Sequence, residues 1–134
     1  MKCISLADDS FEHHFPGKPV YPGALLIESL AQLGGALLEL SLRDDRPYCP
    51  RCVLSKVEAR FREFALPGDA LRLRAEVASL HAESAMVKAA AMRGDQRICE
   101  AQLLFVFLRI EDERLERSRR EYLEVLTRAA RIVP

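Results

Sequence analysis

The chain has 134 residues, of which 49% are hydrophobic and 30% charged, and its 20 Lys and Arg residues balance 20 Asp and Glu residues. This length and composition predict one domain with a conventional hydrophobic core, which excludes a disordered chain and a disulfide scaffold. Because the net charge is zero, nucleic acid is not attracted at long range and we expect no nucleic-acid partner.

The sequence also argues against a membrane segment. No uninterrupted apolar run reaches about 18 residues, and the first residues lack the apolar segment of a secretory signal. We therefore expect a cytoplasmic protein with no membrane partner.

The four cysteines are Cys3, Cys99 and one C-x-x-C pair, Cys49 and Cys52. In a reducing compartment they are expected to be structural thiols. A redox pair at Cys49 and Cys52, or half of a zinc site, is the alternative. No second C-x-x-C or spaced histidine pair completes a zinc site, so we expect no metal.

The N-terminal part of the chain predicts a short strand, a loop and a long helix. Residues 2–6 are typical of a strand, and residues 8–21 form a loop rich in proline and glycine. Residues 24–42 are apolar almost all round, which in a soluble protein indicates a helix buried in the core. Pro22 suits the first turn of this helix, and residues 43–50 form a polar loop.

From Arg51 onward, apolar and polar residues alternate, which predicts half-buried strands. Residues 71, 73, 75 and 77, for example, are apolar, whereas residues 72, 74 and 76 are charged. The predicted strands are residues 52–64, 70–81, 83–93 and 96–110. Because short turns at residues 67–69 and 94–95 connect them, neighbouring strands run antiparallel.

Residues 111–131 predict an amphipathic helix with a narrow apolar stripe of Leu115, Tyr122, Leu126 and Ala129. Together these elements indicate an α+β fold, in which an antiparallel sheet wraps around a long central helix and an extra amphipathic helix follows. We expect a single domain over residues 1–134, with a core of residues 1–110 and a helical extension of residues 111–134.

Glu28 is an ionisable residue inside the apolar helix, and its neighbours demand burial. A buried carboxylate without a partner is costly, so we expect Glu28 to be paired, protonated or facing a cavity. Desolvation would favour the protonated form, which could donate a proton near neutral pH. A structural carboxylate that binds loop amides is the alternative.

His14 lies in the loop before the helix, where prolines and glycines can hold one side chain in a fixed place. Its position alone does not distinguish it from His13, and a surface histidine is the alternative. Gly23 follows Pro22 at the predicted start of the helix. Unpaired N–H groups at that positive end of the helix dipole could hold a developing oxyanion.

The segment from His14 to Gln32, HFPGKPVYPGALLIESLAQ, resembles the signature HFPGxPVxPGVLxxEAxAQ of the FabZ-type 3-hydroxyacyl-acyl carrier protein dehydratases. Ala24 and Ser29 are mild substitutions within it. Residues 59–69 resemble a second family segment, ARFRRPVVPGD, although Glu63-Phe64 replaces Arg-Pro. The resemblance covers about residues 2 to 108 and implies the hot-dog fold.

The resemblance implies that His14 and Glu28 are the catalytic pair and come from opposite subunits of a dimer. It also implies that the Val20 carbonyl orients the histidine and that the Gly23 amide binds the thioester oxygen. Gln32 lies one helical turn after Glu28 and is expected to support its carboxylate.

The implied reaction removes water from a 3-hydroxyacyl thioester to give the trans-2-enoyl thioester, in fatty acid or polyketide and polyene-type biosynthesis. It needs no metal or redox cofactor. The implied partners are an acyl carrier protein that carries the substrate and further subunits, in a homodimer, a trimer of dimers or a heterodimer. We expect the central helix and the sheet to line an apolar tunnel for the acyl chain.

Two departures from the family concern the ends of the chain. Family members carry an additional N-terminal helix and strand, so we expect the C-terminal helix or a partner subunit to cover an edge of the sheet. The C-terminal helix is longer than in the family. Its arginines form either a solvated face or a basic surface for an acidic carrier protein: Arg117, Arg119, Arg120, Arg128 and Arg131.

Two other function classes are alternatives to the dehydratase. A hot-dog acyl thioesterase would use its carboxylate to activate water, but such enzymes generally lack the HFPG motif. A catalytically weak acyl-binding subunit of a synthase is the second alternative, and the presence of both His14 and Glu28 argues against it.

Overall fold

The computed structural model describes residues 1–129 except residues 6, 8, 13, 44, 46, 47 and 49. His13, Cys49 and Arg131 lie outside this part of the chain. The elements are, in chain order, β1 (Lys2–Cys3), the 3-10 helix η1 (Asp9–Phe11), α1 (Gly23–Leu42), β2 (Arg51–Phe61), β3 (Ala70–Leu80), β4 (Ser84–Arg93), β5 (Gln96–Leu108) and α2 (Glu113–Ala129).

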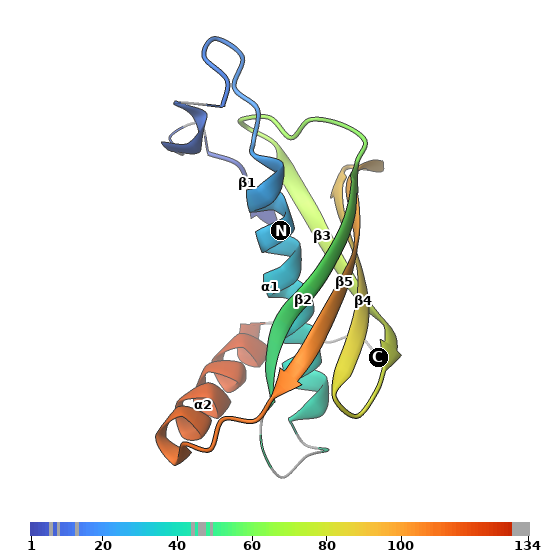
Figure 1. The fold of residues 1–134 in the computed structure, drawn as a ribbon. Coiled ribbons are helices and arrows are strands. Elements are labelled where there is room, and N and C mark those ends of the chain that lie inside the picture. Colours follow the sequence, from blue (N-terminus) through green and yellow to red (C-terminus); the bar gives the residue numbers. More distant parts are fainter. Residues whose placement is uncertain are drawn as a thin grey trace.

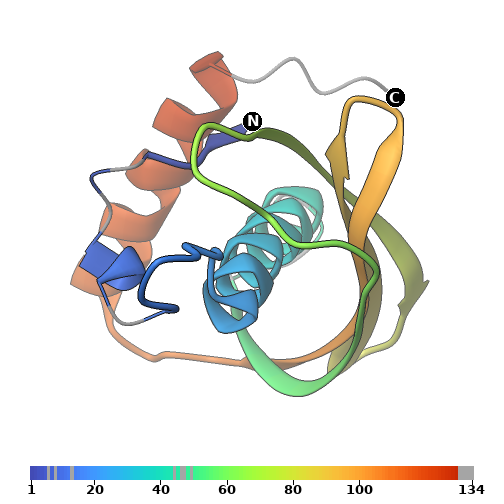
Figure 2. The ribbon, with the colours of Figure 1, turned by 90° about the horizontal axis from the view of Figure 1, so that it is seen from above.

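The five strands form one antiparallel sheet in the order β1-β3-β4-β5-β2. The sheet curls around α1, which lies along its concave side (Figure 1). Seen from above, the strands pass around one side of α1 and α2 lies on the other side (Figure 2). The predicted α+β arrangement of a sheet around a central helix is therefore confirmed, together with the extra C-terminal helix.

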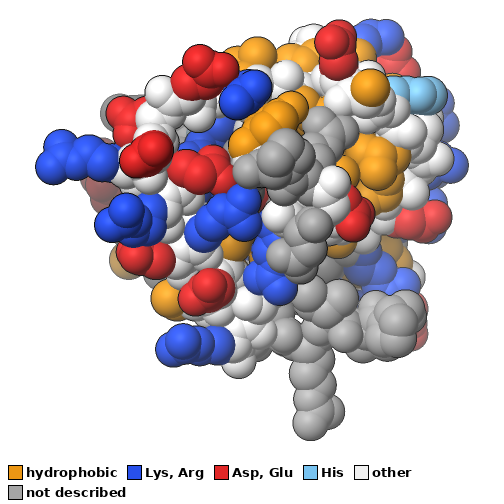
Figure 3. Space-filling model, turned by 90° about the horizontal axis from the view of Figure 1, so that it is seen from below, with side chains coloured by type: hydrophobic (Ala, Val, Ile, Leu, Met, Phe, Trp, Pro, Cys, Tyr) orange, Lys and Arg blue, Asp and Glu red, His pale blue; other side chains and the backbone are white. Residues whose placement is uncertain are grey.

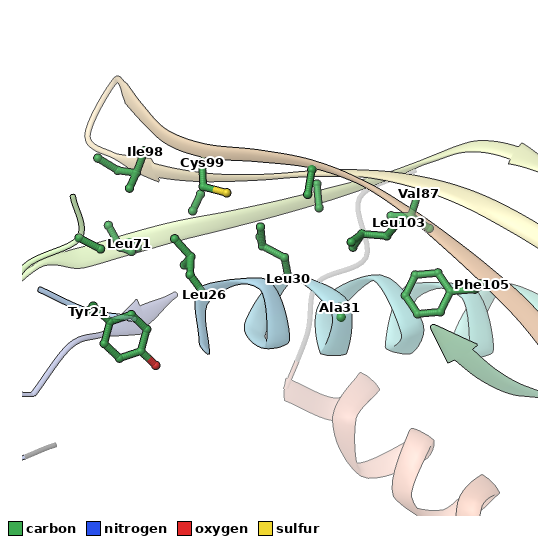
Figure 4. Packing of buried hydrophobic residues seen from close by; sticks show 14 of the residues in the cluster. Tyr21, Leu26, Leu30, Ala31, Leu71, Val87, Ile98, Cys99, Leu103 and Phe105 are labelled. Carbon is green, nitrogen blue, oxygen red and sulfur yellow. The ribbon is translucent and has the colours of Figure 1, made fainter. Parts of the chain in front are cut away.

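The core fills the space between α1 and the concave face of the sheet. Leu30 of α1 and Val87 and Leu103 of the sheet are all fully buried there (Figure 4). Gly34 allows a close approach, because a Cβ at this position would lie 3.2 Å from Val87 Cγ1 and 3.3 Å from Phe105 Cε2. Helix and sheet therefore pack closely at this position.

By length and composition alone, α1 is long and apolar enough to cross a membrane, which was not predicted. In the fold it is the core helix, and its apolar side chains, Leu26 and Leu38 among them, are buried by the rest of the chain.

The second helix, α2, is fixed to α1 by a buried ion pair. Arg119 of α2 binds the carboxylate of Glu39, which is 4% exposed, through its Nε and a terminal nitrogen. The other oxygen of Glu39 accepts a hydrogen bond of 3.4 Å from the backbone nitrogen of Cys52. Glu39 thus joins three elements: α1, the beginning of β2, and α2.

The predicted apolar stripe of α2 is partly wrong. Leu123 is fully buried and Leu126 is half-buried, whereas Leu115 is 51% and Tyr122 50% exposed. The ion pair explains why Leu123 and Leu126 are the more buried residues. They lie on the same helix face as Arg119, and the bond between Arg119 and Glu39 places that face against α1. The side chain of Ala129 lies outside the described part.

The described arginines of α2 do not act together as one basic surface. Arg119 pairs with Glu39, and the Arg120 Nε donates to Glu116 at 3.1 Å, while Arg117 and Arg128 are exposed. On the face seen from below, positive and negative side chains are interspersed (Figure 3).

The two edges of the sheet differ. β1 has two residues, whereas β2 at the opposite edge has 11 and pairs with β5 alone in the described sheet. α2 reaches the beginning of β2, where Arg51 Nη2 donates to the Leu115 carbonyl at 3.0 Å. Val57 and Phe61, further along β2, are 38% and 50% exposed.

Candidate active site

The loop before α1 holds the side chain of His14 in a defined orientation. The His14 Nδ1 lies 3.0 Å from the Val20 carbonyl oxygen, and the Val20 N–H donates back to the His14 carbonyl at 2.9 Å. Two further backbone hydrogen bonds join Phe15 and Lys18, and Gly17 between them has a φ of +76°, a conformation that favours glycine. The His14–Phe15 peptide bond is cis, and the imidazole ring stacks on the Phe15 ring.

The contact with Val20 assigns the proton on the imidazole. A carbonyl oxygen can only accept a hydrogen bond, so Nδ1 of His14 carries the hydrogen. In the neutral ring, Nε2 is therefore the nitrogen with a free lone pair, which is the form that a general base requires.

Glu28 lies in the second turn of α1, and Gln32 Nε2 donates to its Oε1 at 2.7 Å, as the helical spacing predicts. Glu28 is thus paired, but the burial that its apolar neighbours suggested does not occur in the single chain, since both residues are exposed. The reason is directional, because the apolar neighbours of Glu28 point toward the sheet and its own side chain points away from it. Among the described residues, the buried carboxylate of α1 is Glu39.

The first turn of α1 presents backbone donors. Pro22 makes no side-chain cap, and its carbonyl accepts the N–H groups of Leu25 at 3.1 Å and Leu26 at 3.2 Å. The preceding N–H of Gly23 has no acceptor among the described residues. Since it lies at the positive end of the helix dipole, it can bind a negatively charged oxygen.

Phe61, at the end of β2, lies against the same turn. A Cβ on Gly23 would be 2.8 Å from the Phe61 Cζ, so the ring occupies the place of a side chain at that position. Phe61 lies in the segment of residues 59–69 that resembles the family, but its contact with Gly23 was not predicted.

His14 and Glu28 share no hydrogen bond within the described chain. A broad, open hollow of the surface is lined by Leu33 and Leu37 of α1, by small residues of the sheet such as Ala59, and by charged residues such as Arg74; it does not reach His14 or Glu28. The buried core fills the helix–sheet interface around Leu30, Val87 and Leu103, whereas beside Leu33 and Leu37 the hollow is open rather than the closed tunnel that we expected. Within one protomer, His14 is thus half-buried and Glu28 is exposed.

The described thiols differ in reactivity. Cys3 is exposed, whereas Cys99 is buried in β5 and belongs to the core. Burial, helped by the charge of the adjacent Glu100, raises the pKa of the Cys99 thiol to about 11. Cys99 is therefore a protonated, unreactive side chain at neutral pH.

Comparison with known proteins identifies the family. A family model described as a FabA-like domain matches residues 1–102. The 3-hydroxyacyl-[acyl-carrier-protein] dehydratase FabZ of Chlamydia trachomatis is 37% identical over 110 residues, which are 82% of this chain and 72% of that protein. The protein of the same name from Pediococcus pentosaceus is 36% identical over 106 residues, or 78% and 69% of the two chains.

Solved structures share the fold at low identity. A hot-dog-like protein from Thermanaerovibrio acidaminovorans has a TM-score of 0.67 at 16% identity and covers 98% of this chain and 88% of its own. A probable thioesterase from Bartonella henselae has a TM-score of 0.62 at 17% identity, covering 84% and 90%. These likenesses confirm the predicted hot-dog fold. The family model and the curated relatives together show that the chain belongs to the FabA-like family and, within it, to the FabZ 3-hydroxyacyl-acyl carrier protein dehydratases.

Proposed function

We propose that the protein dehydrates a 3-hydroxyacyl-acyl carrier protein thioester to the trans-2-enoyl thioester in fatty acid biosynthesis. The observation that carries the proposal is the contact between His14 Nδ1 and the Val20 carbonyl, which fixes the ring and leaves Nε2 free as a base. The named activity of relatives that are 36% and 37% identical supports the same reaction.

In the proposed mechanism, Nε2 of His14 removes a proton from C2 of the substrate, which the neighbouring thioester acidifies. The N–H of Gly23 and the dipole of α1 stabilise the negative charge that builds on the thioester oxygen. Protonated Glu28, positioned by Gln32, donates its proton to the departing 3-hydroxyl group. Water leaves, and a double bond forms between C2 and C3. Transfer of the proton from His14 to Glu28 restores the starting state.

We further propose that two protomers complete the site. The support is the exposure of Glu28, Gln32 and Leu25 on α1 and of Val57 and Phe61 on β2, which leaves an ionisable group among apolar side chains open to water. A second copy that covers this surface would desolvate Glu28 and bring the partner's loop toward it. The proposed assembly is a homodimer, a trimer of such dimers, or a heterodimer with a related chain.

An acyl carrier protein is the proposed donor of the substrate, and the cytoplasm is the proposed location. The interspersed charges on α2 give little support to a single basic docking surface on that helix, since Arg119 and Arg120 are occupied within the chain. We therefore treat the exposed Arg117 and Arg128 as a solvated face.

The test supplies a 3-hydroxyacyl-acyl carrier protein as substrate and measures the enoyl thioester that forms by its absorbance. His14→Ala and Glu28→Gln should each abolish most turnover without loss of the circular dichroism spectrum, because both groups act in one transition state. Full activity of either variant would refute the assignment.

Mixing the two inactive variants tests the shared site. Hybrid dimers contain one intact His14 and Glu28 pair, so partial activity should return if the pair forms across subunits. No recovery after subunit exchange, verified with differently tagged chains, would count against that arrangement.

The same assay distinguishes the alternative functions. A thioesterase would release a free thiol without enoyl absorbance, and an acyl-binding subunit would give neither product. The thioesterase-like solved structures share less than 20% identity with the chain, for example 17% for the Bartonella protein, and so support the fold alone.

A further inference from the structure

The loop that carries His14 is joined to the sheet by a chain of hydrogen bonds. The chain begins where His14 Nδ1 donates to the Val20 carbonyl at 3.0 Å. The same peptide group contains the N–H of Tyr21, which donates to the Ala65 carbonyl at 2.8 Å. Since a peptide group is planar, the direction of this N–H fixes the direction of the carbonyl that binds His14.

A second peptide group continues this hydrogen-bonded chain. The Ala65 carbonyl shares its peptide group with the N–H of Leu66, and this N–H donates to Asp69 Oδ2 at 2.9 Å. Asp69 is the last residue of the segment of residues 59–69 that resembles the family. All three N–H donors of the chain thus point the same way, and the chain ends on a carboxylate.

Asp69 is in turn fixed to the sheet. Arg93, the last residue of β4, donates from Nη1 to Asp69 Oδ2 at 2.9 Å and to the Phe64 carbonyl at 3.3 Å. Its Nη2 donates to Gln96 Oε1, at the start of β5, at 3.1 Å. The side chains of Asp69 and Arg93 are 16% and 31% exposed, so their ion pair is partly shielded from water. The chain from His14 therefore ends on a regular hairpin, and strands hold side chains more precisely than loops do.

The middle of the hydrogen-bonded chain is buried. Val20 and Tyr21 are each 6% exposed, and Ala65 is 4% exposed. Water therefore does not compete for the hydrogen bond between Tyr21 and Ala65, and successive hydrogen bonds in such surroundings polarise one another. The last bond of the chain is also strengthened, because its acceptor is the carboxylate of Asp69. The Val20 carbonyl is thus a firmly held and polarised acceptor for His14.

We propose that Asp69 and Arg93 are positioning residues for the dehydration, which hold the His14 ring with its hydrogen on Nδ1 and its Nε2 free for the substrate. This inference rests on the proposed dehydratase function. Both residues act through His14 and not on the substrate itself. Arg93 offsets part of the charge of Asp69, so the carboxylate acts more by the position of its oxygen than by its charge. Loss of that oxygen releases Leu66 and the peptide groups behind it, and the ring of His14 can then turn.

The kinetic experiment compares kcat and KM for dehydration of a 3-hydroxyacyl-acyl carrier protein by the wild type, Asp69→Ala and Asp69→Asn. Asp69→Ala removes the acceptor at the end of the chain, so kcat should fall roughly tenfold to a hundredfold, the scale of a misplaced catalytic group. KM should change little, because the substrate does not contact Asp69. Asp69→Asn keeps an oxygen that can accept the Leu66 N–H, and it should retain most of kcat.

Glu100→Ala is the matched control for the loss of an ion pair. Glu100 lies on β5 and accepts from Arg62 at 2.6 Å and from Arg97 at 2.8 Å, and not from a member of the hydrogen-bonded chain. Its removal should leave both kcat and KM at the wild-type values.

The spectroscopic experiment uses nitrogen NMR of the imidazole rings in the protein without substrate, with His14→Gln to assign the signals. In the wild type, the neutral His14 ring should show a protonated Nδ1 and an unprotonated Nε2. Asp69→Ala should shift the ring to a mixture of the two tautomers, whereas Asp69→Asn should keep the wild-type form. The ring of His81, in the connection between β3 and β4, is the internal reference and should stay unchanged.

If Asp69→Ala does not fold, Arg93→Met provides the same test, because it removes the anchor of Asp69 and should lower kcat and mix the tautomers to a smaller extent. A folded variant of either kind that keeps the wild-type kcat and tautomer would overturn the inference. A loss of kcat in Asp69→Asn as large as in Asp69→Ala would also overturn it, since the acceptor oxygen is retained there. Absence of enoyl product with the wild type would instead refute the proposed function, and the NMR experiment would still decide whether Asp69 holds the His14 ring.

Discussion

Arg119→Ala should destabilise the protein strongly, because it leaves the Glu39 carboxylate buried without its cation. Breaking a buried ion pair by removing one partner costs about 3–5 kcal/mol. The side chain of Glu39 is 5% exposed and that of Arg119 is 29% exposed, so water can enter where the guanidinium was. We therefore expect the lower end of the range, a loss of about 3 kcal/mol.

Equilibrium unfolding in urea measures this loss. The chain contains no Trp, so far-UV circular dichroism is the suitable probe. For a domain of this size, a loss of about 3 kcal/mol corresponds to a decrease in Tm of roughly 12 °C. Arg117→Ala is the matched control, since Arg117 is an exposed arginine on the same helix, and it should change the free energy of unfolding by less than about 0.5 kcal/mol.

The double variant Glu39→Leu/Arg119→Met completes the test. Replacing both charges by apolar groups of similar volume should return the stability to within about 1 kcal/mol of the wild type. The reasoning is refuted if Arg119→Ala costs no more than the Arg117→Ala control, because α2 would then not be held by the ion pair.

Two further predictions concern Gly23 and Cys99. Gly23→Ala should destabilise the protein by about 1 kcal/mol, because its Cβ would lie 2.8 Å from Phe61 Cζ, and the second change Phe61→Leu should relieve most of that loss in urea unfolding. An equal loss in both backgrounds would contradict this. For Cys99, the folded pKa of about 11 exceeds the ordinary thiol pKa of 9.0, so the unfolded state loses the thiol proton first. Stability should therefore decrease by up to about 2 kcal/mol as the pH rises from about 9 to 11, and this decrease should be smaller in Cys99→Ala; identical pH profiles would contradict it.

Most of the fold could be predicted from alternation and helical periodicity. The long strands begin within one residue of their predicted starts, and the main deviation is at their ends, where β2 stops at Phe61 rather than at Phe64. The pattern does not distinguish the last residue of a strand from the start of a turn. The first strand is shorter than residues 2–6, and the 3-10 helix at Asp9–Phe11 was not predicted, because short elements carry little periodicity.

The side-chain environment of α1 was harder to predict. Glu28 and Glu39 both occur in an apolar run and lie on one helix face, so local sequence does not indicate which of them is buried. The difference arises from α2, whose Arg119 reaches Glu39 from 80 residues further along the chain. The contact of His14 with Val20 was predicted from the family resemblance, whereas the position of Phe61 over Gly23 requires the curvature of the sheet.

The Glu39–Arg119 pair also bears on how the protein can change by mutation. A chain that lost either residue first would carry an uncompensated charge in its interior and fold poorly, so a stepwise route to a different residue pair passes through a disfavoured intermediate. We therefore expect the two positions to change together among close relatives.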